Sequence, residues 1–144
     1  MNPRKYNVDE LLKDGQPVQF PITGWSMYPF LSDGDLVTVA PIDPTTLKVG
    51  DVVLYRREHG PLILHRLIKI TQEGYWMCGD NQSELEGPLD PSMCYGKLIE
   101  YTHNGKTVST TSLTYCSKVW GWRMLRPVRP AISKTVHKLK QIAK

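Results

Sequence analysis

Residues 18–39 read VQFPITGWSMYPFLSDGDLVTV, and this stretch decides the fold that we expect. Apolar residues alternate with polar or small ones over residues 18–22, which predicts a strand, and alternation resumes at Leu36. The residues between the two strands are rich in Gly, Ser, Asp and Pro, which predicts a turn. Ser26 therefore lies in a turn between two strands, where its hydroxyl can be exposed.

Further strands are predicted by alternation and by short apolar runs. They cover residues 52–55, 62–70, 75–78, 95–103 and 106–114. Asn104-Gly105 separates the last two, and this dipeptide suits the positive φ angles of a tight hairpin turn. A short helix is predicted at residues 7–13, and residues 79–93 are predicted to form a surface loop because Gly, Asp, Asn, Ser and Pro dominate them. The expected fold is mainly β, a small coiled sheet that closes partly into a barrel.

The chain divides by charge into a body and a tail. Its 144 residues are the length of one domain with its own hydrophobic core. Residues 117–144 hold eight of the 18 Lys and Arg residues and none of the 14 acidic residues, so residues 1–116 carry ten basic and 14 acidic residues, a net charge of −4. We expect residues 1–116 to form the folded domain and residues 117–144 a basic tail, which either meets an anionic partner or is simply solvated.

The tail interleaves tryptophans with basic residues, and a helix with an apolar stripe is predicted from Ala131 onward. Tryptophan rings beside cationic side chains suit the interface of an anionic membrane, which we expect as a partner of residues 117–144 ahead of nucleic acid. The alternative is that the same apolar stripe packs onto the body.

Several features bear on the location of the protein. The sequence has no run of about 18 apolar residues and no basic-then-apolar leader, so we expect a cytoplasmic or peripheral membrane location. Cys78, Cys94 and Cys116 form no CxxC pair, and an odd number of cysteines cannot all pair within one chain, which favours a reducing compartment. No metal site or cofactor is predicted.

Ser26 has the surroundings of a nucleophile. Gly24 lets the backbone bend close to it, and Pro29 fixes φ shortly after it, so the turn is rigid and nearby amides are free to face a ligand. Free N–H groups are what the oxyanion of an acyl-transfer reaction needs. A serine hydroxyl alone is a weak nucleophile, and it requires a neighbouring base.

His65 is the histidine whose position fits that base. It lies inside an apolar strand on the same face as Ile63 and Leu67, which points it inward. The other three histidines lie in predicted turns or in the tail, where a solvated surface position accounts for them: His59, His103 and His137. Considered by itself, His65 is more simply a hydrogen-bonded core histidine.

Three acidic residues are candidates to orient that histidine. Asp80 follows a predicted strand in the segment Cys78-Gly79-Asp80-Asn81, where a carboxylate can meet His65 or, alternatively, bond its own backbone as a turn residue. Glu84 and Glu86 follow in the same predicted loop, and either could take the orienting role instead.

These segments together resemble the signal peptidase and LexA-type serine peptidase superfamily. The matching blocks, in the superfamily's order, are GWSMYPFLSDGDLVTV, VGDVVLYRR, LILHRLI, CGDNQ and YGKLI, and they cover about residues 18–100. The resemblance implies the coiled-sheet fold of that superfamily and a peptidase activity. The sequence shows no transmembrane anchor before Ser26 and has no room there for a helix-turn-helix domain. We therefore expect a bare catalytic domain.

The resemblance also implies residue roles. Ser26 of the SM-x-P block is the nucleophile, with its own amide in the oxyanion hole, and His65 stands where many relatives have a lysine base, which places the chain in the Ser-His branch. Asp80 matches the Asp of the family's GDN block, and Glu86 matches a second acid six residues later. The family's Asp-Arg pair is replaced by Glu86-Gly87-Pro88, so either acid is left to orient His65.

The expected function is serine endopeptidase activity on an extended peptide or protein precursor. We expect Gly24, Met27 and Pro29 to line the substrate site beside Ser26. The alternative is a catalytically inactive module of the same fold that binds peptides in the same groove.

Overall fold

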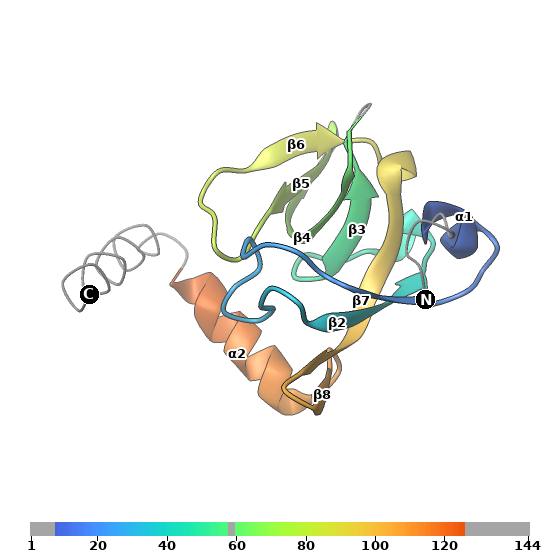
Figure 1. Cartoon of the computed structure of the whole chain (residues 1–144). Coiled ribbons are helices and arrows are strands. Elements are labelled where there is room, and N and C mark those ends of the chain that lie inside the picture. The colour runs from blue at the N-terminus through green and yellow to red at the C-terminus, as the bar shows by residue number, and fades with distance from the viewer. Residues whose placement is uncertain (1–7, 58–59, 126–144) are drawn as a thin grey trace.

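A computed structural model describes residues 8–57 and 60–125 (Figure 1). Its strands are all antiparallel and form one sheet in the order β1-β2-β7-β3-β4-β5-β6, with β8 paired to β7. The strands are β1 (Val18–Pro21), β2 (Leu36–Pro41), β3 (Val52–Arg56), β4 (Leu62–Thr71), β5 (Gly74–Cys78), β6 (Glu86–Leu89), β7 (Cys94–His103) and β8 (Lys106–Ser109). The helices are α1 (Val8–Lys13) and α2 (Leu113–Met124), with 3-10 turns η1 (Pro44–Thr46) and η2 (Pro91–Met93). The predicted mainly β fold is confirmed.

The long strand β7 belongs to two parts of the coiled sheet. β7 pairs with β2 and with β3, and the register shifts in both pairings, between Thr38 and Val39 and between Leu54 and Tyr55. Figure 1 shows β3 to β6 in the upper part of the view and β2 and β8 in the lower part, with β7 running from one group to the other. The described strand order has two free ends, β1 and β6, so the barrel is only partly closed.

β3 is buried on both faces and separates two hydrophobic cores. Val52 and Leu54 belong to the larger core, whereas Val53 and Tyr55 belong to the smaller one. The consecutive apolar residues of this strand follow from its position, because a strand covered on both sides has no solvent face to keep polar.

The Asn104-Gly105 hairpin is confirmed. Asn104 has φ 49° and Gly105 has φ 78°, the two positive values that a tight turn of this kind needs, and His103 pairs with Lys106 across it. The predicted N-terminal helix is also present from Val8 onward.

The prediction of a loop over residues 79–93 is wrong in part, because β6 lies within it. Gly87 and Pro88 indicate a break in a strand pattern, but β6 is at the edge of the sheet and pairs with β5 through only two registered residues, Glu86 and Leu89. An edge strand tolerates proline because one side of its backbone makes no ladder bonds.

The second strand of the hairpin is shorter than predicted, since it ends at Ser109 rather than at residue 114. Ser112 caps a helix instead, with its hydroxyl accepting a hydrogen bond from the Tyr115 amide at 3.2 Å. This helix, α2, crosses the predicted boundary between residues 116 and 117, and it buries Tyr115 and Val119 in the larger core.

Part of the tail therefore lies on the body. The helix predicted from Ala131, together with His59 and His137, lies outside the described residues. Among the helices that the structure describes, none is long and apolar enough to cross a lipid bilayer.

Candidate active site

The turn that carries Ser26 is held at its base by hydrogen bonds between its two ends. The Gly34 amide donates to the Ile22 carbonyl at 2.8 Å, and the Gly24 amide, at a φ of 91°, donates to Asp33 Oδ1 at 2.7 Å. That φ lies in the region that favours glycine, so Gly24 is required here by its backbone conformation.

His103 helps to fix the same turn. Its Nδ1 lies 2.6 Å from Oδ1 of the buried Asp35, whose other oxygen accepts from the Ser32 amide at 2.8 Å. The sequence predicts a solvated His103, and its side chain is partly exposed, but it also connects the hairpin to the Ser26 turn.

The backbone of Ser26 rests on the turn that follows β5. The Asn81 amide donates to the Ser26 carbonyl at 2.9 Å, and the Asn81 side chain donates to the Trp25 carbonyl at 3.2 Å. Gly79 makes this contact feasible, because a Cβ at that position would stand 2.5 Å from the Ser26 carbonyl oxygen. Ser26 and the segment that follows β5 are thus positioned as one unit.

Neither the hydroxyl nor the amide of Ser26 forms a hydrogen bond within the described part of the chain. The adjacent Met27 is 3% exposed and belongs to the larger core, so its side chain anchors the turn from below. Pro29 follows Tyr28 through a cis peptide bond and is exposed. The Met27 side chain is therefore buried under the turn, whereas Pro29 lies on the exposed face of the turn.

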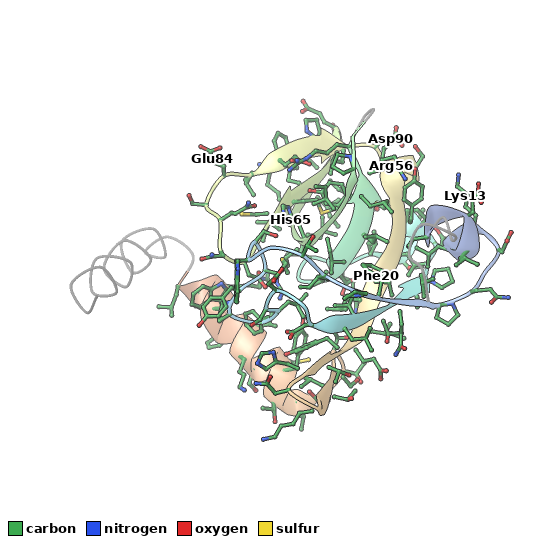
Figure 2. The ribbon with its side chains drawn as sticks, viewed as in Figure 1. Lys13, Phe20, Arg56, His65, Glu84 and Asp90 are labelled. Carbon is green, nitrogen blue, oxygen red and sulfur yellow. The ribbon has the colours of Figure 1, made fainter. Side chains whose placement is uncertain are left out.

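His65 points inward from β4, as the alternation predicts, and is 5% exposed. Its Nδ1 lies 3.2 Å from the hydroxyl of Tyr55 on the neighbouring strand (Figure 2 labels His65). Burial lowers the pKa of His65 below its ordinary value of 6.5, so the imidazole is neutral at neutral pH. A neutral imidazole is the form that can accept a proton.

His65 opens onto a cavity of about 500 Å³. The cavity is lined by His65, Arg57 and Met77, by the segment that joins β5 to β6, and by the first residue of β6, Glu86. The joining segment supplies Gln82, Ser83, Glu84 and Leu85. In the described residues no hydrogen bond joins His65 to Ser26. Such bonds are often long in the absence of substrate and tighten when it binds.

Asp80 is buried and paired with Arg66. Arg66 Nε donates to Asp80 Oδ1 at 2.8 Å, and Nη2 donates to Oδ2 at 2.7 Å, so the two side chains form a bidentate pair. Arg66 also donates to the Gly50 carbonyl and to the Tyr115 hydroxyl, and its guanidinium lies 5.2 Å from the centre of the Phe30 ring. The pair thus connects β4, the turn after β5, α2 and the Ser26 turn.

Glu86 is a residue of β6 that lines the cavity. Its Oε2 accepts a hydrogen bond from Arg57 Nε at 2.6 Å, whereas its Oε1 is buried with no hydrogen-bond partner in the described residues. Burial is the largest single influence and by itself would raise the pKa of Glu86, but the neighbouring Arg57 and Tyr55 side chains together outweigh it, so the pKa is lowered. The Glu86 carboxylate is therefore ionised at neutral pH, and its negative charge acts on both Tyr55 and His65.

The structure thus gathers the predicted residues into two connected parts. Ser26, with Gly24 and Met27, docks on the turn that contains Asp80, while His65 and Glu86 line the cavity formed by the continuation of that turn. Glu84 also lines the cavity. In the part of the chain that the structure describes, no carboxylate forms a direct hydrogen bond with a ring nitrogen of His65.

Sequence reasoning missed Tyr55, Arg57 and Arg66. Arg66 is next to His65, and a charged residue within an apolar strand is a signal that it has a buried partner. The role of Tyr55 depends on the register of β3 against β4, which pairs Val53 with His65 and Tyr55 with Ile63, and no local pattern reveals that register.

Comparison with known protein families gives a match to the sequence of this chain. A family described as Peptidase S24-like matches residues 4–94, the part of the chain from the N-terminal helix to the start of β7. No protein among curated sequences matches the chain.

Proposed function

The chain belongs to the Peptidase S24-like family, and from this premise we propose that it is a signal-peptidase-like serine endopeptidase. Ser26 is its nucleophile and His65 its general base. The observation that carries this proposal is that one segment serves both residues. Residues 79–81 hold the Ser26 backbone, and residues 82–86 line the cavity onto which His65 opens.

The reaction follows from the chemistry of these two side chains. His65 Nε2 accepts the Ser26 proton as the hydroxyl oxygen attacks the scissile carbonyl. The resulting oxyanion takes hydrogen bonds from free amides of the turn, of which the N–H of Ser26 is one. Imidazolium then gives its proton to the leaving amine, and water, activated by His65, releases the acyl group from Ser26.

The substrate is an extended peptide or a protein precursor. Extended peptides bind by adding a strand to an exposed sheet edge, and β1, which leads directly into the Ser26 turn, lies at one end of the described strand order. Its backbone is therefore available on one side to align the scissile bond with Ser26. The cavity beside His65 has the size of a pocket for side chains near that bond.

A cleavage assay tests this function. The wild type and the Ser26→Ala and His65→Ala variants are incubated with a library of unstructured peptides, and the products are read by mass spectrometry. We expect cleavage by the wild type, and a fall of about 10³-fold or more in each variant. Equal cleavage by all three proteins contradicts the proposal.

An inactive peptide-binding module remains the rival function, because the same groove serves binding without chemistry. The same library separates the two. A wild type that binds members of the library but cleaves none favours the rival.

We further propose that α2 contacts an anionic membrane surface. Leu113, Trp120 and Met124 recur at helical spacing on the face opposite to the buried Tyr115 and Val119, and their exposed fractions are 86%, 66% and 64%. Residues 117–144 supply eight basic and no acidic side chains next to this stripe in sequence, which complements anionic headgroups.

A further inference from the structure

Tyr55 is a buried side chain with a polar end inside the candidate active site, and the reaction described above does not use it. Its exposed fraction is zero, and its ring is held in the smaller core with Leu67 and Met77. Its hydroxyl reaches Nδ1 of His65 at 3.2 Å. A buried hydroxyl needs a hydrogen-bond partner, and the partner that receives its proton decides whether the hydroxyl donates to His65 or accepts from it.

We propose that Tyr55 is a positioning residue that fixes the tautomer of His65, donating its hydroxyl proton toward Glu86 and accepting the Nδ1 proton of the imidazole. This inference rests on the proposed function, since it explains how His65 is kept ready as a base. Tyr55 would then stand between the carboxylate and the imidazole, in place of a carboxylate that bonds the histidine directly.

The sheet register provides the geometry. Val53 is opposite His65 and Tyr55 is opposite Ile63, so Tyr55 and His65 are diagonal neighbours on one face of the β3–β4 pair. Their rings meet edge to face, with centroids 6.1 Å apart and planes at 64°. Because Tyr55 is enclosed by the core, this approach is fixed by packing and not by a mobile surface side chain.

Because the Tyr55 hydroxyl has a single proton, it can donate to either Glu86 or His65, but not to both. A tyrosine hydroxyl has one proton, and an ionised carboxylate can only accept. Burial and the charge of the nearby Glu86 raise the pKa of the Tyr55 hydroxyl by more than Arg57 lowers it, so the hydroxyl keeps its proton at neutral pH. With that proton directed to Glu86, the Tyr55 oxygen faces His65 as an acceptor, and the imidazole proton must be on Nδ1.

Glu86 has an oxygen to spare for this role. Its Oε2 is occupied by Arg57, and its Oε1 is the buried acceptor that has no hydrogen-bond partner in the described residues. A buried carboxylate oxygen without a donor costs free energy, so a shift of the side chain that completes a bond from Tyr55 is favourable. Asp80, the other acid whose charge acts on His65, already has both oxygens engaged by Arg66.

The tautomer matters because the two ring nitrogens have different tasks. With the proton on Nδ1, Nε2 has a free lone pair and can accept the Ser26 proton. With the proton on Nε2, the ring presents a donor to Ser26 and cannot act as its base. Tyr55 thus selects the reactive form without touching the substrate.

Nuclear magnetic resonance of ¹⁵N-labelled imidazole tests this inference directly. The His65 signals, assigned by comparison with His65→Ala, are expected to show a protonated Nδ1 and an unprotonated Nε2 in the wild type at neutral pH. In Tyr55→Phe, which keeps the buried ring, we expect the population to shift to the Nε2–H form. The kcat for peptide cleavage should fall by about 10²-fold, with KM changed by less than about twofold.

Two further variants separate positioning from a general effect on the core. Glu86→Gln should invert the bonds: its amide oxygen faces Arg57, its NH₂ donates to Tyr55, and Tyr55 then donates to Nδ1, which gives the Nε2–H form. Tyr75→Phe is the matched control, because Tyr75 also lies in the smaller core but donates its hydroxyl to the Pro44 carbonyl at 2.7 Å. It should leave the His65 tautomer and kcat unchanged.

The tautomer does not depend on whether any peptide is cleaved, so the two proposals fail separately. A wild type that cleaves no peptide contradicts the proposed function, whereas a wild-type His65 protonated on Nε2 overturns this inference. It is also overturned if the wild type cleaves peptides while Tyr55→Phe retains both the wild-type tautomer and the wild-type kcat.

Discussion

At the scale of single residues, the burial of His65 links its charge to activity. The base must be neutral, and burial lowers its pKa below 6.5. We therefore predict that kcat/KM is constant near neutral pH and falls as the pH is lowered through the folded-state pKa, with a midpoint below 6.5. A profile of kcat/KM against pH measures this midpoint. A midpoint above 6.5 contradicts the assignment of His65 as a buried base.

The same pKa also affects stability. The unfolded chain binds a proton at His65 near pH 6.5, whereas the folded chain resists it until the pH is lower. The free energy of unfolding therefore contains a contribution from His65 that is present above pH 6.5 and is lost as the pH falls through the folded-state pKa. His65→Gln should show a smaller fall of this free energy over that range, as measured by urea unfolding.

The buried Arg66–Asp80 pair predicts a large effect on stability. Asp80→Asn leaves the charge of Arg66 without a counter-charge in a site where both side chains are at most 2% exposed. Removal of one partner of such a pair costs about 3–5 kcal/mol, so we expect the free energy of unfolding in urea to fall by about that amount.

Lys97→Gln is the control for the Arg66–Asp80 prediction. Lys97 pairs with Asp51 at 3.4 Å, but its side chain is partly exposed, and such pairs contribute about 0–1 kcal/mol. If Asp80→Asn lowers stability no more than Lys97→Gln does, the buried pair does not hold the site together as described.

At the scale of elements, the contact between the Ser26 turn and the turn after β5 is the feature that positions the nucleophile. Gly79→Ala would place a Cβ 2.5 Å from the Ser26 carbonyl oxygen, so one of the two turns must move. A displacement of about 1 Å at a reacting group can cost about 10²-fold in rate, and we expect kcat to fall by that order. Steady-state kinetics on a cleaved peptide measure this effect.

Gly121→Ala is the matched control for that substitution. Gly121 lies within α2, and a Cβ there would meet nothing within 4 Å. We expect unchanged kcat and a gain in stability of up to about 1 kcal/mol, because alanine favours a helix over glycine. Equal loss of activity in both variants would mean that the Gly79 contact has no special role.

The sequence predicts those elements whose signals are local. The hairpin at Asn104-Gly105 and the inward face of His65 follow from turn chemistry and alternation, and both are present. β6 was missed because Gly87 and Pro88 contradict a strand by propensity, and only pairing with β5 overrides them. α2 was missed because its tryptophans and basic residues were interpreted as a separate tail, whereas one face of the helix packs on the core.

In the candidate site, too, some features follow from sequence signals and others depend on tertiary structure. Ser26 and His65 are found from the order of the sequence blocks, but the partners of each acid are not. Asp80 bonds Arg66, which follows from the placement of the turn after β5, and Glu86 bonds Arg57 across β3 and β6. These contacts depend on tertiary structure, on which a single sequence provides no direct signal.

At the scale of the whole molecule, the apolar stripe of α2 and the basic tail predict binding to anionic membranes. We expect the chain to sediment with vesicles that contain phosphatidylserine, to bind less at high salt, and to lose roughly tenfold in affinity for each of Trp120→Ser and Met124→Ser. The physical reason is the lost burial of an exposed apolar side chain in the headgroup region.

Ile70→Ser provides the control, because Ile70 is an exposed apolar residue on β4, outside α2. It should bind vesicles like the wild type. Equal binding by all of these variants contradicts the membrane role of α2, and binding to duplex DNA in place of vesicles would assign the basic tail to nucleic acid.

The claim that Ser26 is a nucleophile activated by His65 is tested most directly by trapping the acyl-enzyme. A peptide p-nitrophenyl ester is mixed with the protein, the reaction is quenched in acid within the first turnovers, and the mass of each tryptic fragment is measured. We predict one adduct, on the fragment that contains Ser26, which forms in the wild type, forms far more slowly in His65→Ala and is absent from Ser26→Ala. An adduct on another residue, or one that forms equally fast without His65, would contradict the account.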